Sequence, residues 1–145
     1  MSDPIKELLH EYPITLQLPV QWGDMDSFGH VNNLIYLRWF ESGRIAYFEA
    51  FDGMDREKSG GIGPILGHVD CRYKIPVEYP DTITVGVRIS DIGEDRITMH
   101  QRVVSHLHGK VAAEGSGVMV CLDYAKGIKA AVPESWLKAI ARIEG

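Results

Sequence analysis

The sequence lacks the features of several protein classes. Its only two cysteines, Cys71 and Cys121, both lie in strand-like patterns, so we expect buried thiols and no disulfide framework. No apolar run approaches the roughly 20 residues of a membrane-spanning helix, and residues 1–13 lack the basic and apolar regions of a signal peptide. Lys and Arg number 15 against 20 Asp and Glu, with no long basic cluster. The sequence therefore predicts a cytoplasmic protein whose partners include neither nucleic acid nor a membrane.

What the sequence does contain is typical of a globular enzyme or binding protein. Its 145 residues are 45% hydrophobic and 24% charged, which is an ordinary balance for a soluble fold. This length is sufficient to bury a core without disulfides or metal ions. We find no internal repeat and no low-complexity tract. We therefore expect one domain spanning residues 1–145.

The most informative stretch runs from Trp22 to Tyr36. Residues 15–21, just before it, alternate apolar and polar side chains, which predicts a strand with one buried face. Residues 33–51 are apolar on most sides of a helical projection and carry few charges, which predicts a long helix wrapped by the rest of the protein. At 1.5 Å per residue this helix would be roughly 28 Å long.

The turn between this strand and this helix carries two carboxylates, Asp24 and Asp26, followed by Gly29, His30 and two asparagines. A carboxylate delivered to a helix N-terminus lies beside backbone N–H groups that have no partner within the helix. A base and oxyanion donors are the two parts that attack on a carbonyl requires. This turn is therefore the predicted active site.

The remainder of the chain is predicted to form the sheet that covers this helix. A glycine-rich connection is expected at residues 52–63, and a short helix at 133–143 ends the chain. Between them, period-two patterns predict four strands joined mostly by hairpins, at residues 68–75, 82–90, 96–106 and 111–123. The last of these strands is expected to be broken by Gly115 and Gly117. Consecutive strands after one helix predict an α+β fold, in which an antiparallel sheet wraps around one long buried helix.

With these elements in place, the chain resembles the hotdog-fold acyl-CoA thioesterases of the 4-hydroxybenzoyl-CoA thioesterase type. The resemblance covers residues 14–123. Its most specific part is the Asp-x-Asp-x-x-Gly spacing that leads into a buried helix. The matching residues are Trp22-x-Asp24-x-Asp26-x-x-Gly29-His30-Val31-Asn32-Asn33-x-x-Tyr36, then Phe40-Glu41-x-x-Arg44, and the Pro-x-x-Tyr-x-Asp run that ends at Asp81.

The resemblance implies hydrolysis of an acyl-CoA thioester, with Asp26 as nucleophile or general base. It also implies that the backbone N–H of Asn33 polarises the thioester carbonyl. His30 is a third candidate for catalysis, and Asn32 and Tyr36 are candidates for substrate binding. No metal or cofactor is expected, since coenzyme A is part of the substrate. The family's usual arrangement implies a homodimer whose sheets join edge to edge, or a homotetramer.

Other hypotheses stay open at this point. Asp26 and His30 also fit a hotdog hydratase or dehydratase that acts on an acyl thioester. A non-catalytic acyl-CoA-binding protein would share every fold argument. His30 equally fits a structural donor in a capping turn. Glu41 offers a second carboxylate, but its spacing from Arg38 and Arg44 favours an ion pair on the helix surface.

Overall fold

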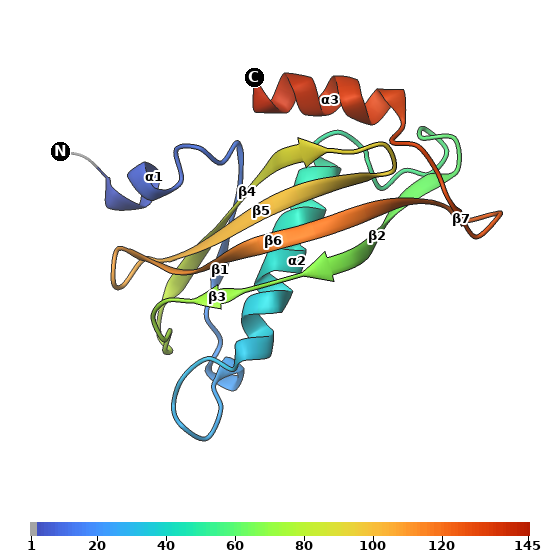
Figure 1. Ribbon diagram of the computed structural model, residues 1–145. Helices are drawn as coiled ribbons and strands as arrows, with labels where there is room; N and C mark the ends of the chain where they lie inside the picture. The colour runs from blue at the N-terminus through green and yellow to red at the C-terminus, as the bar shows by residue number, and fades with distance from the viewer. Residues whose placement is uncertain (1–2) are drawn as a thin grey trace.

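The computed structural model describes residues 3–145, in which one antiparallel sheet curls around one long helix (Figure 1). The helices are α1 (Pro4–Leu8), the short 3-10 helix η1 (Trp22–Asp24), α2 (Asn33–Glu49) and α3 (Glu134–Glu144). The strands are β1 (Ile14–Pro19), β2 (Ile62–Val69), β3 (Arg72–Tyr73), β4 (Thr82–Ile92), β5 (Arg96–Ser105), β6 (Lys110–Asp123) and β7 (Ile128–Lys129). The predicted α+β class is confirmed.

The sheet has the strand order β1-β4-β5-β6-β2, and every pairing is antiparallel. The short strands β3 and β7 also pair with β6. Strands β4 and β5 are joined by a tight turn at residues 93–95, and they form the middle of the sheet with β6. The helix α2 crosses the concave face of this sheet and contacts β1, β4 and β5 (Figure 1).

Two of the predicted strands are wrong in their details. The strand expected at residues 68–75 is two strands, β2 and β3, and β2 begins at Ile62, inside the segment expected to be a loop. Strand β2 lies at a sheet edge, and most of its residues are exposed. Its sequence therefore lacks the alternation of apolar and polar residues that marks a half-buried strand. The last long strand of the chain, β6, is not broken by its glycines and runs without interruption over 14 residues.

The glycines of β6 serve close packing. A Cβ atom at Gly115 would lie 2.0 Å from the carbonyl oxygen of Asp70. At Gly117 it would lie 2.9 Å from the side-chain oxygen of Gln101 and 3.1 Å from Nη1 of Arg44. Glycine is therefore required where neighbouring groups approach the strand, and the strand itself continues.

The long helix is also less completely wrapped than expected. Its sheet-facing side is buried, but a stripe of residues faces away from the sheet and is exposed: Leu34, Arg38, Glu41 and Glu49. These positions are spaced four, three and eight residues apart, which places them on one side of a helix. Arg44, the other charged residue of α2, is buried at 4% exposure.

Buried Arg44 links α2 to the middle of the sheet. Its Nη1 donates to Oε1 of the fully buried Gln101 at 2.9 Å, and Nε2 of Gln101 donates to the carbonyl oxygen of Gly115 at 3.0 Å. Burial lowers the pKa of the Arg44 guanidinium. The side-chain pair therefore connects the helix to both β5 and β6.

The C-terminal helix α3 closes the end of α2 that lies farthest from residue 33. Trp136 packs on Phe48 with a ring-centroid distance of 5.3 Å, and Tyr47 donates to the Glu144 carboxylate at 2.6 Å. Cys121 is buried and Cys71 half-buried, and both are free thiols, as predicted. Among residues 3–145 no helix has the length and apolar character needed to cross a membrane.

Candidate active site

The turn that follows β1 is a small hairpin with a fixed geometry. Met25 and Val31 form an isolated antiparallel bridge, and the N–H of Asp26 donates to the carbonyl of His30 at 2.9 Å. Gly29 closes the tip with φ +81°, a conformation that glycine adopts without steric cost. The spacing of four residues between Asp26 and His30 therefore makes them neighbours across the turn.

The two aspartates of this turn have different surroundings. The Asp24 carboxylate accepts the N–H of Gln21 at 2.8 Å and is part of the capping box of η1, so it stabilises the turn itself. Asp26 uses one oxygen, Oδ1, to accept the N–H of Phe28 at 2.9 Å. No residue from 3 to 145 donates to its other oxygen, and its side chain is exposed. Asp26 is the aspartate that is free to act on a bound molecule.

The first turn of α2 leaves one backbone donor free. Asn32 is the N-cap residue: its side-chain oxygen accepts the N–H of Leu34 and its carbonyl accepts the N–H of Ile35, both at 2.9 Å. Within the described part of the chain the N–H of Asn33 donates to no acceptor. An unpaired N–H in the first turn of a helix is suited to bind an oxygen that carries negative charge.

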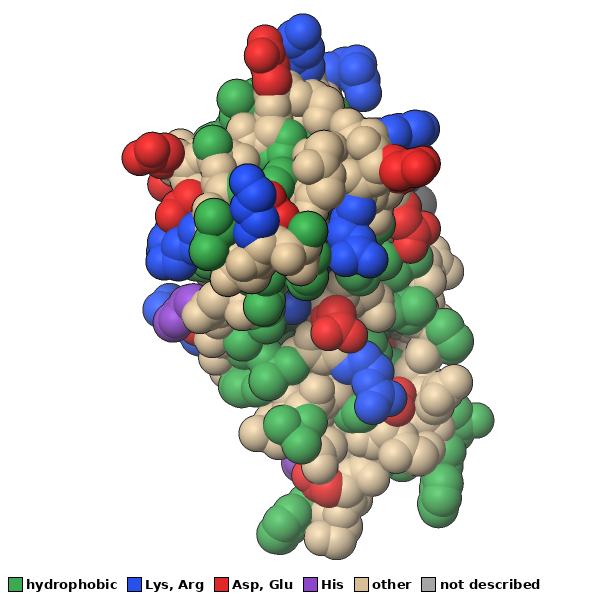
Figure 2. Space-filling view, turned by 90° about the vertical axis from the view of Figure 1, so that its right-hand side faces the viewer, with side chains coloured by type: hydrophobic (Ala, Val, Ile, Leu, Met, Phe, Trp, Pro, Cys, Tyr) green, Lys and Arg blue, Asp and Glu red, His purple; other side chains and the backbone are tan. Residues whose placement is uncertain are grey.

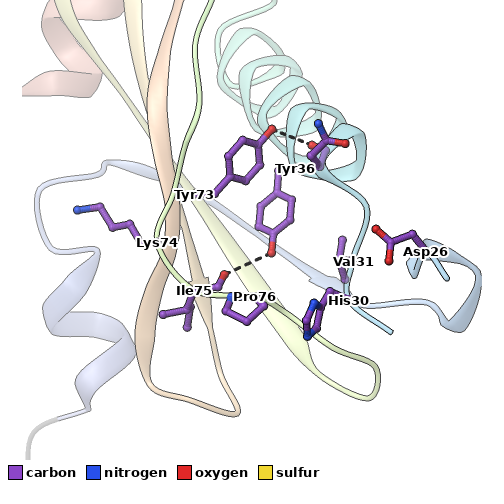
Figure 3. A pocket seen from close by; sticks show the side chains of 9 residues that line it. Asp26, His30, Val31, Tyr36, Tyr73, Lys74, Ile75 and Pro76 are labelled. Carbon is purple, nitrogen blue, oxygen red and sulfur yellow. Dashed lines mark hydrogen bonds between the residues drawn. The ribbon is translucent and has the colours of Figure 1, made fainter. Parts of the chain in front are cut away.

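Asp26 and Asn33 line one open cavity of about 410 Å³ (Figure 3). The other lining residues are His30, Val31, Tyr36, Tyr73, Lys74, Ile75 and Pro76. Figure 3 shows the Asp26 carboxylate directed inward, with the rings of Tyr36 and Tyr73 between α2 and the segment from Lys74 to Pro76. The N–H of Val31 donates to the carbonyl of Val77 at 2.8 Å, which connects the hairpin to that segment.

The two tyrosines brace the wall of the cavity. Tyr73 donates to the carbonyl oxygen of Asn33 at 3.0 Å, and the Tyr36 hydroxyl accepts the N–H of Val77 at 3.1 Å. Their rings meet edge to face with centroids 5.1 Å apart. Burial raises the pKa of Tyr36, and burial together with the adjacent Cys71 thiol raises the pKa of Tyr73 to about 12. Both hydroxyls are therefore protonated at neutral pH.

Two charged pairs flank the cavity. Nε2 of His30 lies 3.4 Å from the Glu78 carboxylate, with both side chains about half exposed. Lys74 Nζ lies 3.1 Å from the Glu114 carboxylate. Glu78, Lys74 and Tyr73 were not identified from the sequence as site residues. Glu78 is 48 residues from its partner His30, and no local pattern indicates such a contact.

The structure brings together four of the five residues predicted for the site: Asp26, His30, Asn33 and Tyr36. Asn32 does not line the cavity, and its side-chain oxygen is engaged at the helix cap. The ion pair predicted for Glu41 is wrong: among residues 3–145, Glu41 has no cation within 4.0 Å. It lies on the exposed stripe of α2 with Arg38, while Arg44, the other predicted partner, is buried on the sheet side.

Large apolar side chains are exposed in the turn and at the start of α2. Phe28, Trp22 and Leu34 are 84%, 74% and 63% exposed. Figure 2 shows one side of the molecule, with most Lys, Arg, Asp and Glu over its upper half and hydrophobic side chains over the lower half, where the start of α2 lies. A large exposed apolar surface is typical of a ligand or protein contact region.

Comparison with known proteins relates this chain to enzymes that act on thioesters. The sequence model of the thioesterase-like superfamily matches residues 20–140. A thioesterase from Thermus thermophilus, solved with coenzyme A and zinc, is 31% identical with a TM-score of 0.81; the match covers 93% of this chain and 96% of that one. A candidate thioesterase from Pseudomonas aeruginosa is 32% identical with a TM-score of 0.78, and the match covers 89% of this chain and 98% of that one.

The name of one further relative states its substrate. The long-chain acyl-CoA thioesterase FadM of Escherichia coli K12 is 23% identical over 107 residues, which are 74% of this chain and 81% of FadM.

Proposed function

Because this chain belongs to the thioesterase-like superfamily and is a thioester hydrolase, we propose that it hydrolyses an acyl-CoA to the free acid and coenzyme A. The observation that supports this most strongly is the pairing of two free groups in one cavity. One is the oxygen of the Asp26 carboxylate that accepts no hydrogen bond from residues 3–145, and the other is the N–H of Asn33, which donates to none of these residues.

In this proposal the thioester carbonyl oxygen accepts the N–H of Asn33. Asp26 either attacks the carbonyl carbon, forming an anhydride that water then hydrolyses, or removes a proton from an attacking water. Asn33 stabilises the oxyanion that develops in both cases. Tyr73 holds the helix start in place through its hydrogen bond to the Asn33 carbonyl. His30, oriented by Glu78, lies on the same cavity and is available to hydrogen-bond the substrate or water.

A thioester reduces what the site must supply. A thiol has a pKa of about 8.5, against about 15.7 for water, so coenzyme A leaves as a thiolate without a dedicated acid. One carboxylate and one oxyanion donor are then sufficient. We therefore propose that the reaction proceeds without a metal ion or cofactor.

Coenzyme A is proposed as the carrier because the Thermus thermophilus structure contains coenzyme A and the Escherichia coli relative acts on long-chain acyl-CoA. Two observations bear on which acyl group the enzyme accepts. The sequence resemblance to 4-hydroxybenzoyl-CoA thioesterases favours an aromatic acyl group, and the Escherichia coli relative favours a long aliphatic one.

We also propose that the protein is a homodimer joined along β2, or a tetramer of such dimers. Strand β2 forms one edge of the sheet, and its Ile65 and Leu66 are exposed. A free edge with apolar side chains is prone to pair with another chain. Light scattering coupled to size exclusion tests this arrangement, and Ile65→Lys is expected to lower the measured mass to that of a monomer.

The test of the reaction is release of free thiol from a panel of aromatic, short-chain and long-chain acyl-CoAs. Hydration of an enoyl-CoA is measured in parallel. We expect thiol release from at least one class of substrate and no hydration. Hydration without thiol release would replace the hydrolase proposal by the hydratase one. Saturable binding of acyl-CoA without either reaction would indicate a binding protein.

A further inference from the structure

A second cavity, of about 290 Å³, lies on the other face of the sheet. Gln101 points toward α2, where it bonds Arg44, so its neighbours His100 and Arg102 point to the opposite, outer face. Cross-strand pairing places Arg88 beside His100 and His100 beside Ser116. The same register places Arg102 beside Glu114 and Glu114 beside Arg72. Three arginines from three strands therefore line one outer cavity.

The two carboxylates of this cavity are committed to other groups. Glu114 contacts Arg102 at 3.0 Å and Lys74 at 3.1 Å, and these cations hold its pKa below its usual range although burial opposes this. Asp70 accepts the N–H of Ser116 at 3.1 Å and lies 3.4 Å from His68. Within residues 3–145, no carboxylate lies within 4.0 Å of either of the other two arginines, Arg72 and Arg88.

Arg88 is held in place without having its donors satisfied. Its guanidinium lies over the ring of Tyr12, 5.6 Å from the centroid, and that of Arg102 lies 5.2 Å from the same centroid. The Nε of Arg88 is buried, and no residue from 3 to 145 gives it a hydrogen-bond partner. A buried charged donor without an acceptor is costly in a folded protein, and such donors are rare without a ligand or other explanation.

The neutral groups of the cavity also suit an acceptor. Burial, with Arg88 close by, lowers the pKa of His100, so its imidazole is neutral at pH 7 and donates through one N–H. The Ser116 side chain adds a hydroxyl at the same surface. Fixed guanidinium groups, an imidazole N–H and a hydroxyl are the donors that proteins use for phosphate oxygens.

We propose that this outer cavity binds a phosphate-class dianion, held by the guanidinium groups of Arg88 and Arg72 with His100 and Ser116 as neutral donors. Two sources would supply the same chemistry. One is free phosphate or a small phosphomonoester, and the other is the 3′-phosphate of coenzyme A. The second source alone rests on the proposed function.

The test is a titration of the full chain with inorganic phosphate at constant ionic strength, followed by calorimetry and by backbone amide NMR shifts. We expect saturable binding, with shifts concentrated around Arg72, Arg88, His100 and Ser116. Arg88→Gln is expected to weaken binding by at least about 10-fold, because one charge-assisted contact is lost. Arg72→Gln, at an exposed position, gives the same test should Arg88→Gln fail to fold.

The matched control is Arg142→Gln, which removes the same charge from α3, away from the cavity. It is expected to bind phosphate as the native chain does. Absence of saturable binding would overturn the proposal. Equal binding by native chain, Arg88→Gln and Arg72→Gln would also overturn it, as would shifts confined to the Asp26 cavity. None of these readouts requires turnover, so a failure here is distinct from a failure of the proposed hydrolysis.

Two further titrations identify the source. Coenzyme A and its analogue without the 3′-phosphate are each added to the phosphate-bound protein. Displacement of phosphate by coenzyme A but not by the analogue would support the site and assign it to the 3′-phosphate. Displacement by neither would support a site for a free phosphate or phosphomonoester.

Discussion

The buried pair between α2 and the sheet gives a quantitative prediction. Gln101→Leu leaves the Arg44 guanidinium, 4% exposed, without its hydrogen-bond acceptor. A hydrogen bond to a charged group contributes about 1.5–3 kcal/mol, and a neutral one about 1 kcal/mol. Because the bond from Gln101 to the Gly115 carbonyl is lost as well, we expect Gln101→Leu to lower the free energy of unfolding by about 3 kcal/mol.

Replacing the charged Arg44 should reduce the loss of stability that Gln101→Leu causes. Arg44→Met leaves the Gln101 oxygen unpaired but no longer buries a cation, so we expect a loss of about 1–2 kcal/mol. In the double variant neither buried charge nor unpaired amide remains, and we expect it to be about 2 kcal/mol more stable than the sum of the single losses predicts. Urea unfolding followed by circular dichroism measures all four states of this cycle.

The control for this cycle is Arg38→Met, on the exposed stripe of the same helix, which should change stability by no more than about 0.5 kcal/mol. Losses for Arg44→Met and Gln101→Leu that add within about 0.5 kcal/mol would refute the coupling. A double variant less stable than that sum would refute the argument that Arg44 is buried at a cost that Gln101 offsets.

Three further predictions follow from individual contacts. Tyr73→Phe removes the hydrogen bond to the Asn33 carbonyl, and we expect a roughly 3- to 10-fold lower kcat for thiol release (roughly 1 kcal/mol of positioning energy) with the unfolding midpoint little changed. Gly115→Ala places a methyl group 2.0 Å from the Asp70 carbonyl, so stability measured in urea should fall by more than about 2 kcal/mol. Burial lowers the pKa of His100, so the unfolded chain takes up this proton first as the pH falls below about 6.5. Stability is therefore lost in that range, and His100→Gln should lose less of it between about pH 7 and pH 5.

The parts of the fold that were predictable are those with a strong local pattern. The confirmed α+β fold, an antiparallel sheet around one long helix, was predicted from the apolar helix at residues 33–51 and from the consecutive strands after it, and the motif resemblance added the hotdog family. The start of strand β2 was not predicted, because its residues lie exposed at a sheet edge and show no alternation of apolar and polar side chains. Arg44 appeared to be a surface charge, since nothing in the helix sequence indicates that Gln101 lies opposite it.

The site was predictable for a similar reason. Asp26, His30 and Asn33 lie within eight consecutive residues, so a turn and a helix start bring them together locally. Tyr73 and Glu78 come from the other side of the cavity, and only the folded chain reveals their contacts. The outer arginine cavity depends on the register of four strands, which sequence patterns alone do not give.

The most direct test of the central claim compares Asp26→Asn with Asp24→Asn. Both variants make the same chemical change in the same turn, but only Asp26 lines the cavity. We predict at least a ~100-fold lower kcat for thiol release by Asp26→Asn, with an unchanged unfolding midpoint. Asp24→Asn should stay within about 3-fold of the native kcat, since an amide oxygen still accepts the Gln21 N–H. Native turnover by Asp26→Asn, or equal losses in the two variants, would contradict a catalytic role for Asp26.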